Sequence, residues 1–297
     1  MIKQTLFFTT PVSLSLRLRQ LVIGMGEGEG ETKVTRPIED LGCVVLENPL
    51  IRVTLPCLNA LVEAGVAVIL CDQHGMPSAL LQPLESNATQ AETIRAQVAA
   101  SQPTQKQAWR QLIEAKILGQ AALLDRVGGR GELLRPLARS VRSGDPDNRE
   151  GAAARIYWKQ LFGDDFQRER QGAPPNQLLN YGYAILRAAV ARALLGSGLL
   201  PQFGLFHHNR YNAFPLADDV MEPYRPYVDQ VVYRLYKGGC MQLDKDTKVE
   251  LLRVLTCDVH MDAGTRPLQV ALSFTTASLA RLLTGEDKHL VLPTHLP

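Results

Sequence analysis

The hydrophobic pattern of this chain changes about a third of the way along, and this change constrains the fold more than any other feature. Up to about residue 85, apolar and β-branched runs alternate with turn residues, as at Thr5 to Thr9 and Val66 to Cys71, which is typical of strands. From Lys106 onward, helical spacing takes over, first at Trp109, Leu112, Ile113, Lys116, Ile117 and Gln120. The sequence therefore predicts an α+β chain, with a small N-terminal β domain over residues 1–85, a linker over 86–105 and a larger all-helical C-terminal domain over 106–297.

Two segments of the N-terminal part carry turn and helix signals. The glycine- and glutamate-rich tract over residues 24–31 is expected to be a flexible turn between strands. It is not a dinucleotide-binding fingerprint, because the residues that follow it, TKVTRPIEDL, open no helix. A short helix is expected from Pro56 to Ala64, and Gly65 is the residue that ends it.

The composition is that of a folded protein of two domains. The chain has 297 residues, of which 45% are hydrophobic and 21% charged. No apolar run approaches the roughly 20 residues that cross a bilayer, and the N-terminus lacks the cleavage site of a secretion signal. The five cysteines are scattered and form no CxxC pair, which favours buried thiols over a disulfide framework or a zinc site. We expect a cytoplasmic protein with no membrane partner.

Arginines are concentrated in one part of the helical region. Between Arg126 and Arg155 there are seven arginines and four acidic residues, although the formal net charge of the whole chain is only +2. Arginine suits bidentate contacts with phosphate, so the run is a candidate for nucleic-acid binding. A solvated helical face is the alternative explanation.

The stretch from Phe206 to Arg225 gathers the side chains with the most chemistry. It holds an imidazole pair, three carboxylates and an arginine: His207, His208, Asp218, Asp219, Glu222 and Arg225. If the segment is helical from Leu216, Glu222 lies one turn after both aspartates, and the like charges repel. A positive group is then expected between them, either Arg225 or a divalent cation held jointly with a histidine. The alternative is a histidine pair on a loop followed by an acidic, exposed helical face.

A second carboxylate of interest begins the helix predicted over residues 149–162, which Asp147 or Asn148 can cap. Glu150 shares a stripe with Ala153, Tyr157 and Leu161, where a lone ionised carboxylate is costly to bury. It therefore needs a partner. The alternative is a capping box, in which Glu150 and Asp147 stand three residues apart at the N-terminus of the helix.

These two motifs together resemble the CRISPR-associated spacer-acquisition integrases. The resemblance is carried by EGxAAxxYW over residues 150–158 and by LFHHNRYNAFPLADDVMEPYRP over residues 205–226. It is strongest to the branch that accompanies single-protein, RNA-guided effector nucleases. The segment from Glu47 to Leu84 is similar to the β domain of that family, so the likeness covers most of the chain.

The resemblance implies a metal site in the helical domain. Glu150 corresponds to the family's metal-binding glutamate and Glu222 to its last acidic ligand, and Asp219 matches a further acidic position. One of His207 and His208 corresponds to the histidine ligand; we favour His207 and keep His208 as the alternate. Asp218 has no clear family counterpart and is expected at the surface or behind the ligands. Such a donor set suits Mg²⁺ or Mn²⁺.

The resemblance also implies an activity. The expected protein is a metal-dependent DNA endonuclease and integrase, which inserts new spacer DNA into a CRISPR array by transesterification from a 3′-hydroxyl, in antiviral defence. No Walker-type loop is present, in keeping with a reaction that uses no nucleotide cofactor. Two alternatives remain: a stand-alone metal-dependent DNA nuclease and a non-catalytic architectural DNA-binding protein.

Partners follow from the same resemblance. DNA is expected as the substrate, both as spacer precursor and as CRISPR repeat, with phosphate contacts from Arg225, Arg139, Arg142 and Arg155. The family implies a homodimer bridged by a small ferredoxin-like subunit, with dimer and partner contacts in the N-terminal β domain. A ring-forming accessory protein and the effector nuclease are further expected partners.

Overall fold

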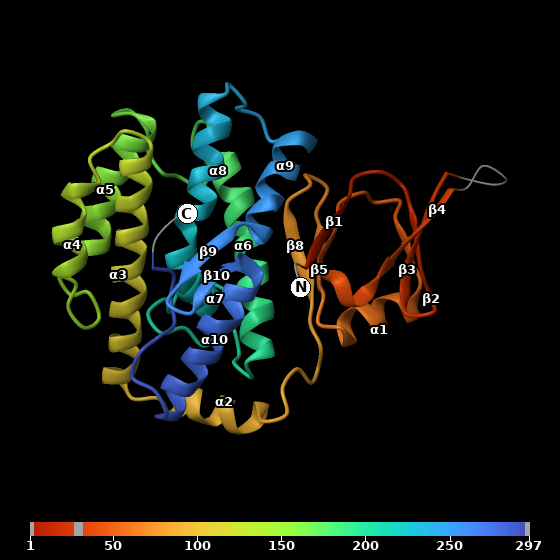
Figure 1. Ribbon diagram of the computed structural model, residues 1–297, viewed down its shortest axis with the longest axis horizontal. Coiled ribbons are helices and arrows are strands. Elements are labelled where there is room, and N and C mark those ends of the chain that lie inside the picture. The colour runs from red at the N-terminus through yellow and green to blue at the C-terminus, as the bar shows by residue number, and fades with distance from the viewer. Residues whose placement is uncertain (1–2, 27–31, 295–297) are drawn as a thin grey trace. The chain divides into compact units, whose positions relative to one another are not determined.

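The chain divides into two compact units, Met1–Ser86 and Asn87–Pro297. The computed structural model describes residues 3–26 and 32–294. The division falls next to the predicted end of the β domain at residue 85. An N-terminal β-rich unit followed by a mostly helical one confirms the predicted α+β class (Figure 1).

Two four-stranded sheets form the described part of the first unit. One sheet has the order β1 (Gln4–Phe8), β5 (Leu41–Leu46), β7 (Ala67–Cys71), β8 (Pro77–Leu81), in which only the last pair is antiparallel. The other has the order β4 (Thr32–Pro37), β3 (Gln20–Met25), β2 (Ser13–Arg17), β6 (Arg52–Val53). The helix α1 (Leu55–Glu63) and the short 3₁₀ turn η2 (Ile38–Asp40) connect strands.

The core of the first unit is formed by alternate residues of its strands together with α1, as the strand pattern predicts. Its fully buried members include Leu14, Leu21, Leu41, Val44 and Cys57. The helix expected at residues 56–64 is confirmed by α1. Of the tract expected to form a turn over residues 24–31, Gly24 and Met25 belong to β3, which pairs antiparallel with β4, and residues 27–31 lie outside the described part.

Most of the second unit is helical. They are α2 (Gln90–Ala99), α3 (Gln102–Arg126), η3 (Gly131–Leu133), α4 (Arg135–Arg139), α5 (Arg149–Phe162), α6 (Asn176–Gly196), α7 (Pro215–Val220), η4 (Glu222–Tyr224), α8 (Arg225–Lys237), α9 (Lys245–Leu252), η5 (Arg253–Thr256) and α10 (Leu268–Thr284). Figure 1 shows α3 beside α4 and α5, with α6 packed against α8. None of the helices in the described part of the chain combines the length and apolarity that a bilayer crossing requires.

Two details of the prediction for this unit are wrong. The unit is not all-helical, because β9 (Asp258–Met261) and β10 (Gly264–Pro267) form an antiparallel hairpin ahead of α10. The segment 86–105 is not a linker, because it contains α2 and the first turn of α3. The buried side chain of Gln97 binds the backbone of Leu200 as donor and as acceptor, each at 2.9 Å. Polar side chains anchor α2, so its composition resembles that of a linker.

Glycine allows α6 and α8 to come close together. A Cβ atom on Gly182 would lie 2.4 Å from Cγ1 of Val228, which is a steric clash. The absence of a side chain at Gly182 therefore permits the close approach of the two helices. The contact sets the spacing of α8, which begins with Arg225 beside the site described next.

Candidate metal centre

Glu150 is placed at the first turn of α5 by a dense N-terminal cap. The side chain of Asn148 accepts a hydrogen bond from the N–H of Gly151 at 2.9 Å. The carboxylate of Asp145 accepts the N–H groups of Arg149 and Glu150 at 2.8 and 3.0 Å. These acceptors satisfy the free backbone donors of the helix end, so the Glu150 side chain is left to act elsewhere.

The capping-box alternative for Glu150 is therefore not what the structure shows. Asp147 forms an ion pair with Arg142 at 2.7 Å instead of joining a reciprocal cap. The carboxylate of Glu150 extends to Lys116 of α3, whose Nζ lies 2.6 Å from its Oε1. The partner that the apolar stripe requires is thus a lysine from another helix.

Glu222, which opens the 3₁₀ turn η4, contacts the same lysine as Glu150. Its Oε2 lies 2.6 Å from Nζ of Lys116, and its Oε1 lies 2.9 Å from the guanidinium of Arg225. Its side chain is only 3% exposed. Burial by itself raises the pKa of Glu222, but the charges of Arg225 and Lys116 outweigh burial and hold that pKa below its usual value.

The helix expected from Leu216 is not a single α-helix, because the helical type changes at Glu222. The α-helix α7 ends at Val220, and Glu222 opens the 3₁₀ turn η4. Glu222 precedes Pro223, and a residue before proline is disfavoured in the α conformation. As a result, Glu222 faces Lys116 and Arg225, whereas Asp219, three residues earlier, contacts a different group.

Lys116 is the central residue that sequence reasoning missed. Its side chain is 10% exposed and lies between the two glutamates. Burial lowers the pKa of this lysine, but the carboxylates of Glu222 and Glu150 more than compensate and raise it. A signal was present in the sequence, because Lys116 falls on the same helical stripe as Ile113 and Ile117, where a charge needs a partner.

Asp219 organises the loop that carries the histidines. It is fully buried, and its Oδ2 accepts the N–H groups of Leu205 and Phe206 at 2.6 and 3.0 Å. Its Oδ1 lies 2.5 Å from Nδ1 of His207 and 3.3 Å from the N–H of the same residue. With both oxygens engaged in this way, Asp219 stands behind the imidazole as its hydrogen-bond acceptor.

Aromatic packing fixes the ring of His207 further. Trp109 of α3 stacks on Phe206 with ring centroids 4.4 Å apart, and it meets the His207 ring edge-on at 5.6 Å. The hydrogen bond with Asp219 raises the pKa of His207, and the charges of Glu222 and Glu150 add to this effect against burial. Because Nδ1 is engaged with Asp219, Nε2 is the nitrogen that remains for a ligand.

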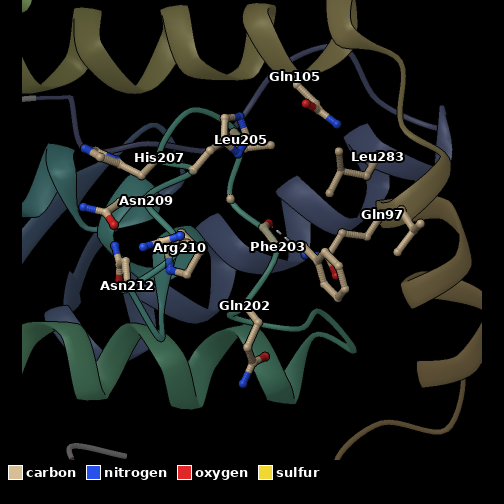
Figure 2. A pocket seen from close by; sticks show the side chains of 14 residues that line it. Gln97, Gln105, Gln202, Phe203, Leu205, His207, Asn209, Arg210, Asn212 and Leu283 are labelled. Carbon is tan, nitrogen blue, oxygen red and sulfur yellow. Dashed lines mark hydrogen bonds between the residues drawn. The ribbon is translucent and has the colours of Figure 1, made fainter.

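His208 lies in a different setting from its neighbour. It is exposed and, with His207, lines a cavity of about 440 Å³ beside the loop. Figure 2 shows the cavity bordered by Gln97 of α2, Gln105 of α3 and Leu283 of α10, together with loop residues that include Phe203 and Arg210. The structure thus places His207, the favoured residue, next to Asp219 and leaves His208 at the cavity.

Of the remaining predicted residues, only Arg225 contacts one of the two glutamates. Asp218 accepts a hydrogen bond from Asn212 at 2.8 Å. Arg225 is engaged with Glu222 and lies over the ring of Tyr183 at 4.6 Å. The candidates for phosphate contacts on α4, the following loop and α5 are all exposed: Arg139, Arg142 and Arg155.

A buried carboxylate that the sequence did not single out ties three helices together. Asp229 of α8 accepts the hydroxyl of Tyr157 of α5 at 2.8 Å and that of Tyr183 of α6 at 2.5 Å. Burial raises the pKa of Asp229 to about 6, although both tyrosines act in the opposite direction. The network joins the helix of Glu150 to the helix of Arg225.

Two carboxylates and an imidazole at this site are donor types that divalent cations bind. Among the described residues, no three His, Cys, Asp or Glu side chains converge closely enough to hold a metal ion. Instead, two carboxylates each place an oxygen 2.6 Å from the same ammonium nitrogen. The buried Oε2 of Glu222 receives no well-aligned hydrogen bond from any described residue. The ammonium group of Lys116 thus lies where oxygens of both carboxylates converge. Such hard oxygen ligands are the ones that divalent cations prefer.

The chain matches known proteins over most of its length. Residues 6–256 match the family described as CRISPR associated protein Cas1. A CRISPR-associated endonuclease Cas1 of Neisseria meningitidis serogroup C (strain 8013) is 38% identical over 89% of this chain and 88% of its own length. A CRISPR-associated endonuclease Cas1 2 of Pyrobaculum aerophilum is 28% identical over 83% of this chain and 89% of its own length.

Solved structures share the fold. A casposase bound to integration product superposes with a TM-score of 0.79 at 20% identity, covering 98% of this chain and 93% of its own. A Cas1 protein from Thermotoga maritima gives a TM-score of 0.69 at 16% identity, covering 98% of this chain and 99% of its own. A Cas6-RT-Cas1–Cas2 complex gives 0.72 at 19% identity, covering 99% of this chain and 36% of its own.

Proposed function

Because this chain belongs to the Cas1 family of CRISPR-associated proteins, we propose that it is a divalent-metal-dependent DNA integrase. In this reaction the 3′-hydroxyl at the end of a spacer precursor attacks a phosphodiester bond of the CRISPR repeat. The new bond joins the spacer to the repeat, and the displaced 3′-oxygen of the repeat leaves with a proton. One phosphodiester is made for each one broken, so no nucleotide cofactor is needed.

One observation carries this proposal. Glu150 and Glu222 belong to segments far apart in the sequence, yet each places a carboxylate oxygen 2.6 Å from the same atom, Nζ of Lys116. His207, supported by Asp219, is close enough for both glutamates to affect its pKa. Two carboxylates and an imidazole are a donor set suited to Mg²⁺ or Mn²⁺, with coordination positions left for phosphate and water.

The residues of the chain have distinct roles at this site. Glu150, Glu222 and Nε2 of His207 would hold the ion, which when bound neutralises charge on the phosphate and activates a hydroxyl. Asp219 accepts the Nδ1 proton and so sets the tautomer and orientation of the imidazole. Arg225 positions Glu222 through the carboxylate oxygen Oε1, whereas Lys116 contacts Oε2. His208, the alternate ligand, is assigned no coordinating role.

The surroundings of the site suit a DNA strand. The loop between α6 and α7, which carries both histidines, exposes large aromatic surface at Phe203, Phe206 and Tyr211. Unpaired bases stack on such rings. The exposed arginines on α4 and α5, with Arg142 between them, would contact phosphates independently of sequence. Arg225 would contribute positive charge near the site while it remains paired with Glu222.

Partners are part of the same proposal. The chain shares its fold with part of a Cas6-RT-Cas1–Cas2 complex, and that likeness supports a small partner subunit. The ferredoxin-like fold of this subunit, a homodimer and contacts through the N-terminal β unit are further parts of the proposal. The likeness to a casposase bound to integration product supports an integration reaction, for which we propose spacer precursor and repeat DNA as the substrates. A ring-forming accessory protein and an effector nuclease remain proposed additional partners.

A joining assay tests the function directly. A DNA duplex with a labelled 3′-hydroxyl strand is incubated with a plasmid that carries a CRISPR repeat, in Mg²⁺, in Mn²⁺ or in EDTA. We expect transfer of the label to the plasmid in either metal and none in EDTA. A matched duplex that ends in a dideoxynucleotide should not be joined, because it lacks the attacking hydroxyl.

The same assay separates the alternatives. Hydrolysis of the labelled strand without joining would support a stand-alone metal-dependent nuclease. DNA binding without any chemistry would support an architectural protein. Glu150→Ala should abolish joining while DNA binding persists, and retained joining by this variant would contradict the proposed site.

A further inference from the structure

Lys116 holds a position that a metal ion would otherwise take. Its Nζ lies 2.6 Å from Oε1 of Glu150 and 2.6 Å from Oε2 of Glu222, and these are the two carboxylates proposed as ligands. The side chain is 10% exposed, so water screens its charge poorly. Without this ammonium, the two carboxylates would repel each other at a site where Glu222 is buried.

The ammonium and a divalent ion cannot occupy this position together. Mg²⁺ binds carboxylate oxygens at ~2.1 Å and Mn²⁺ occupies similar oxygen sites. An ion on Oε1 of Glu150 and Oε2 of Glu222 would therefore compete with Nζ for the same lone pairs. Two cations that share these oxygens would also repel strongly in poorly screened surroundings. Metal binding thus requires Nζ to withdraw from both glutamates.

A second acceptor lies one helical turn from Lys116 on α3. Gln120 follows Lys116 by four residues on α3, so the two side chains are neighbours on one helical face. Its Oε1 is buried and receives no hydrogen bond from any described residue. An unpaired buried acceptor is costly. A displaced ammonium would satisfy it.

We propose that Lys116 is a positioning residue that acts as a built-in competing cation. In the absence of metal it holds Glu150 and Glu222 together, and when a divalent ion binds it moves from these oxygens toward Gln120. The inference rests on the proposed function, because it takes these glutamates as the metal ligands. The inference adds that the apparent metal affinity reflects the replacement of the Lys116 ammonium by the divalent ion at the two glutamates.

Metal binding to variants of the whole chain tests the exchange. Titration calorimetry with Mn²⁺ compares wild type with Lys116→Met and Lys116→Arg, and with Lys159→Met as a control on the exposed face of α5. Lys116→Met should bind Mn²⁺ at least tenfold more tightly than wild type, because the competitor is gone. Lys116→Arg and Lys159→Met should not bind more tightly. Equal or weaker binding by Lys116→Met would overturn the inference.

Thermal stability gives a readout that does not depend on activity. In EDTA, Lys116→Met should melt at a lower temperature than wild type, because the carboxylates lose their counter-charge. Saturating Mn²⁺ should raise its melting temperature by more than it raises that of wild type. An equal rise in both proteins would contradict the exchange.

Crystals of wild type with and without Mn²⁺ keep the test independent of variants that fold poorly. The inference requires Nζ of Lys116 to leave both carboxylates when Mn²⁺ is bound, and Nζ still within hydrogen-bond distance of both would overturn it. If neither wild type nor Lys116→Met binds Mn²⁺, the proposed metal dependence fails as well. Binding that is unaffected by Lys116→Met overturns the inference alone.

Discussion

Nδ1 of His207 lies 2.5 Å from Oδ1 of Asp219, and the same carboxylate accepts backbone N–H groups of the loop that carries the histidine. One buried acid therefore sets both the path of the loop and the orientation of the imidazole. The acidic position three residues before Glu222 thus contacts the loop of the histidines, whereas Glu222 contacts Lys116.

Asp219→Asn should damage the site without removing a ligand. The amide offers one acceptor oxygen where the carboxylate has two, so it cannot serve both Nδ1 of His207 and the N–H groups of Leu205 and Phe206. We expect Mn²⁺ affinity to fall by about 10- to 100-fold, measured by titration calorimetry. Asp218→Asn is the matched control and should change affinity little. Equal losses in the two variants would contradict the distinct role of Asp219.

His207→Ala and His208→Ala should separate the two imidazoles. His207→Ala should abolish DNA joining, because it removes the imidazole that Asp219 orients, whereas His208→Ala should retain joining. The strand-transfer assay with a labelled 3′-hydroxyl duplex measures both. Loss of joining in the His208 variant alone would show that the alternate histidine is the ligand.

The two glutamates should differ in their effect on folding. Glu222→Gln removes the buried carboxylate that pairs with Arg225 and leaves Lys116 with Glu150 alone. Breaking a buried pair from one side costs about 3 to 5 kcal/mol. Glu150 is 24% exposed, so Glu150→Gln should cost less, about 1 to 2 kcal/mol. Urea unfolding in EDTA measures both values. A larger loss from Glu150→Gln would contradict the burial argument, although both variants should lose joining.

Asp229 should make the stability of the protein depend on pH. Burial raises its pKa to about 6 in the folded protein, above the ~3.9 of an unfolded chain. The folded state therefore binds more protons between these values, and the contribution of Asp229 to stability falls as pH rises through that window. The free energy of unfolding of wild type relative to Asp229→Asn should drop by about 2 kcal/mol from pH 4.5 to 7.5.

Urea unfolding of the two proteins at both pH values checks this expectation. Taking the difference between wild type and variant cancels the titration of groups that the substitution does not perturb. A difference that grows toward pH 7.5 would mean that the Tyr157 and Tyr183 hydroxyls outweigh burial and hold the Asp229 carboxylate ionised.

Local sequence patterns predicted most of the secondary structure. The strands β1 and β7 follow runs of alternating or β-branched residues, α3 follows an apolar stripe, and α1 and α5 follow the signals at their ends. The segment of α2 was missed because its anchoring residue, Gln97, is polar and binds backbone groups more than a hundred positions away. The break before η4 was missed although Pro223 marked it.

The sequence by itself determined which residues are candidates for the chemistry, because two carboxylate motifs and a histidine pair can be read from it directly. Only the tertiary structure decided how they are used. It distinguishes His207 from His208, since adjacent residues share one local pattern and differ only in the direction that the loop gives them. It also brings Lys116 between Glu150 and Glu222. Hydrophobic periodicity acts along a single segment, whereas the pairing of charges depends on distances between segments that exist only after the chain has folded.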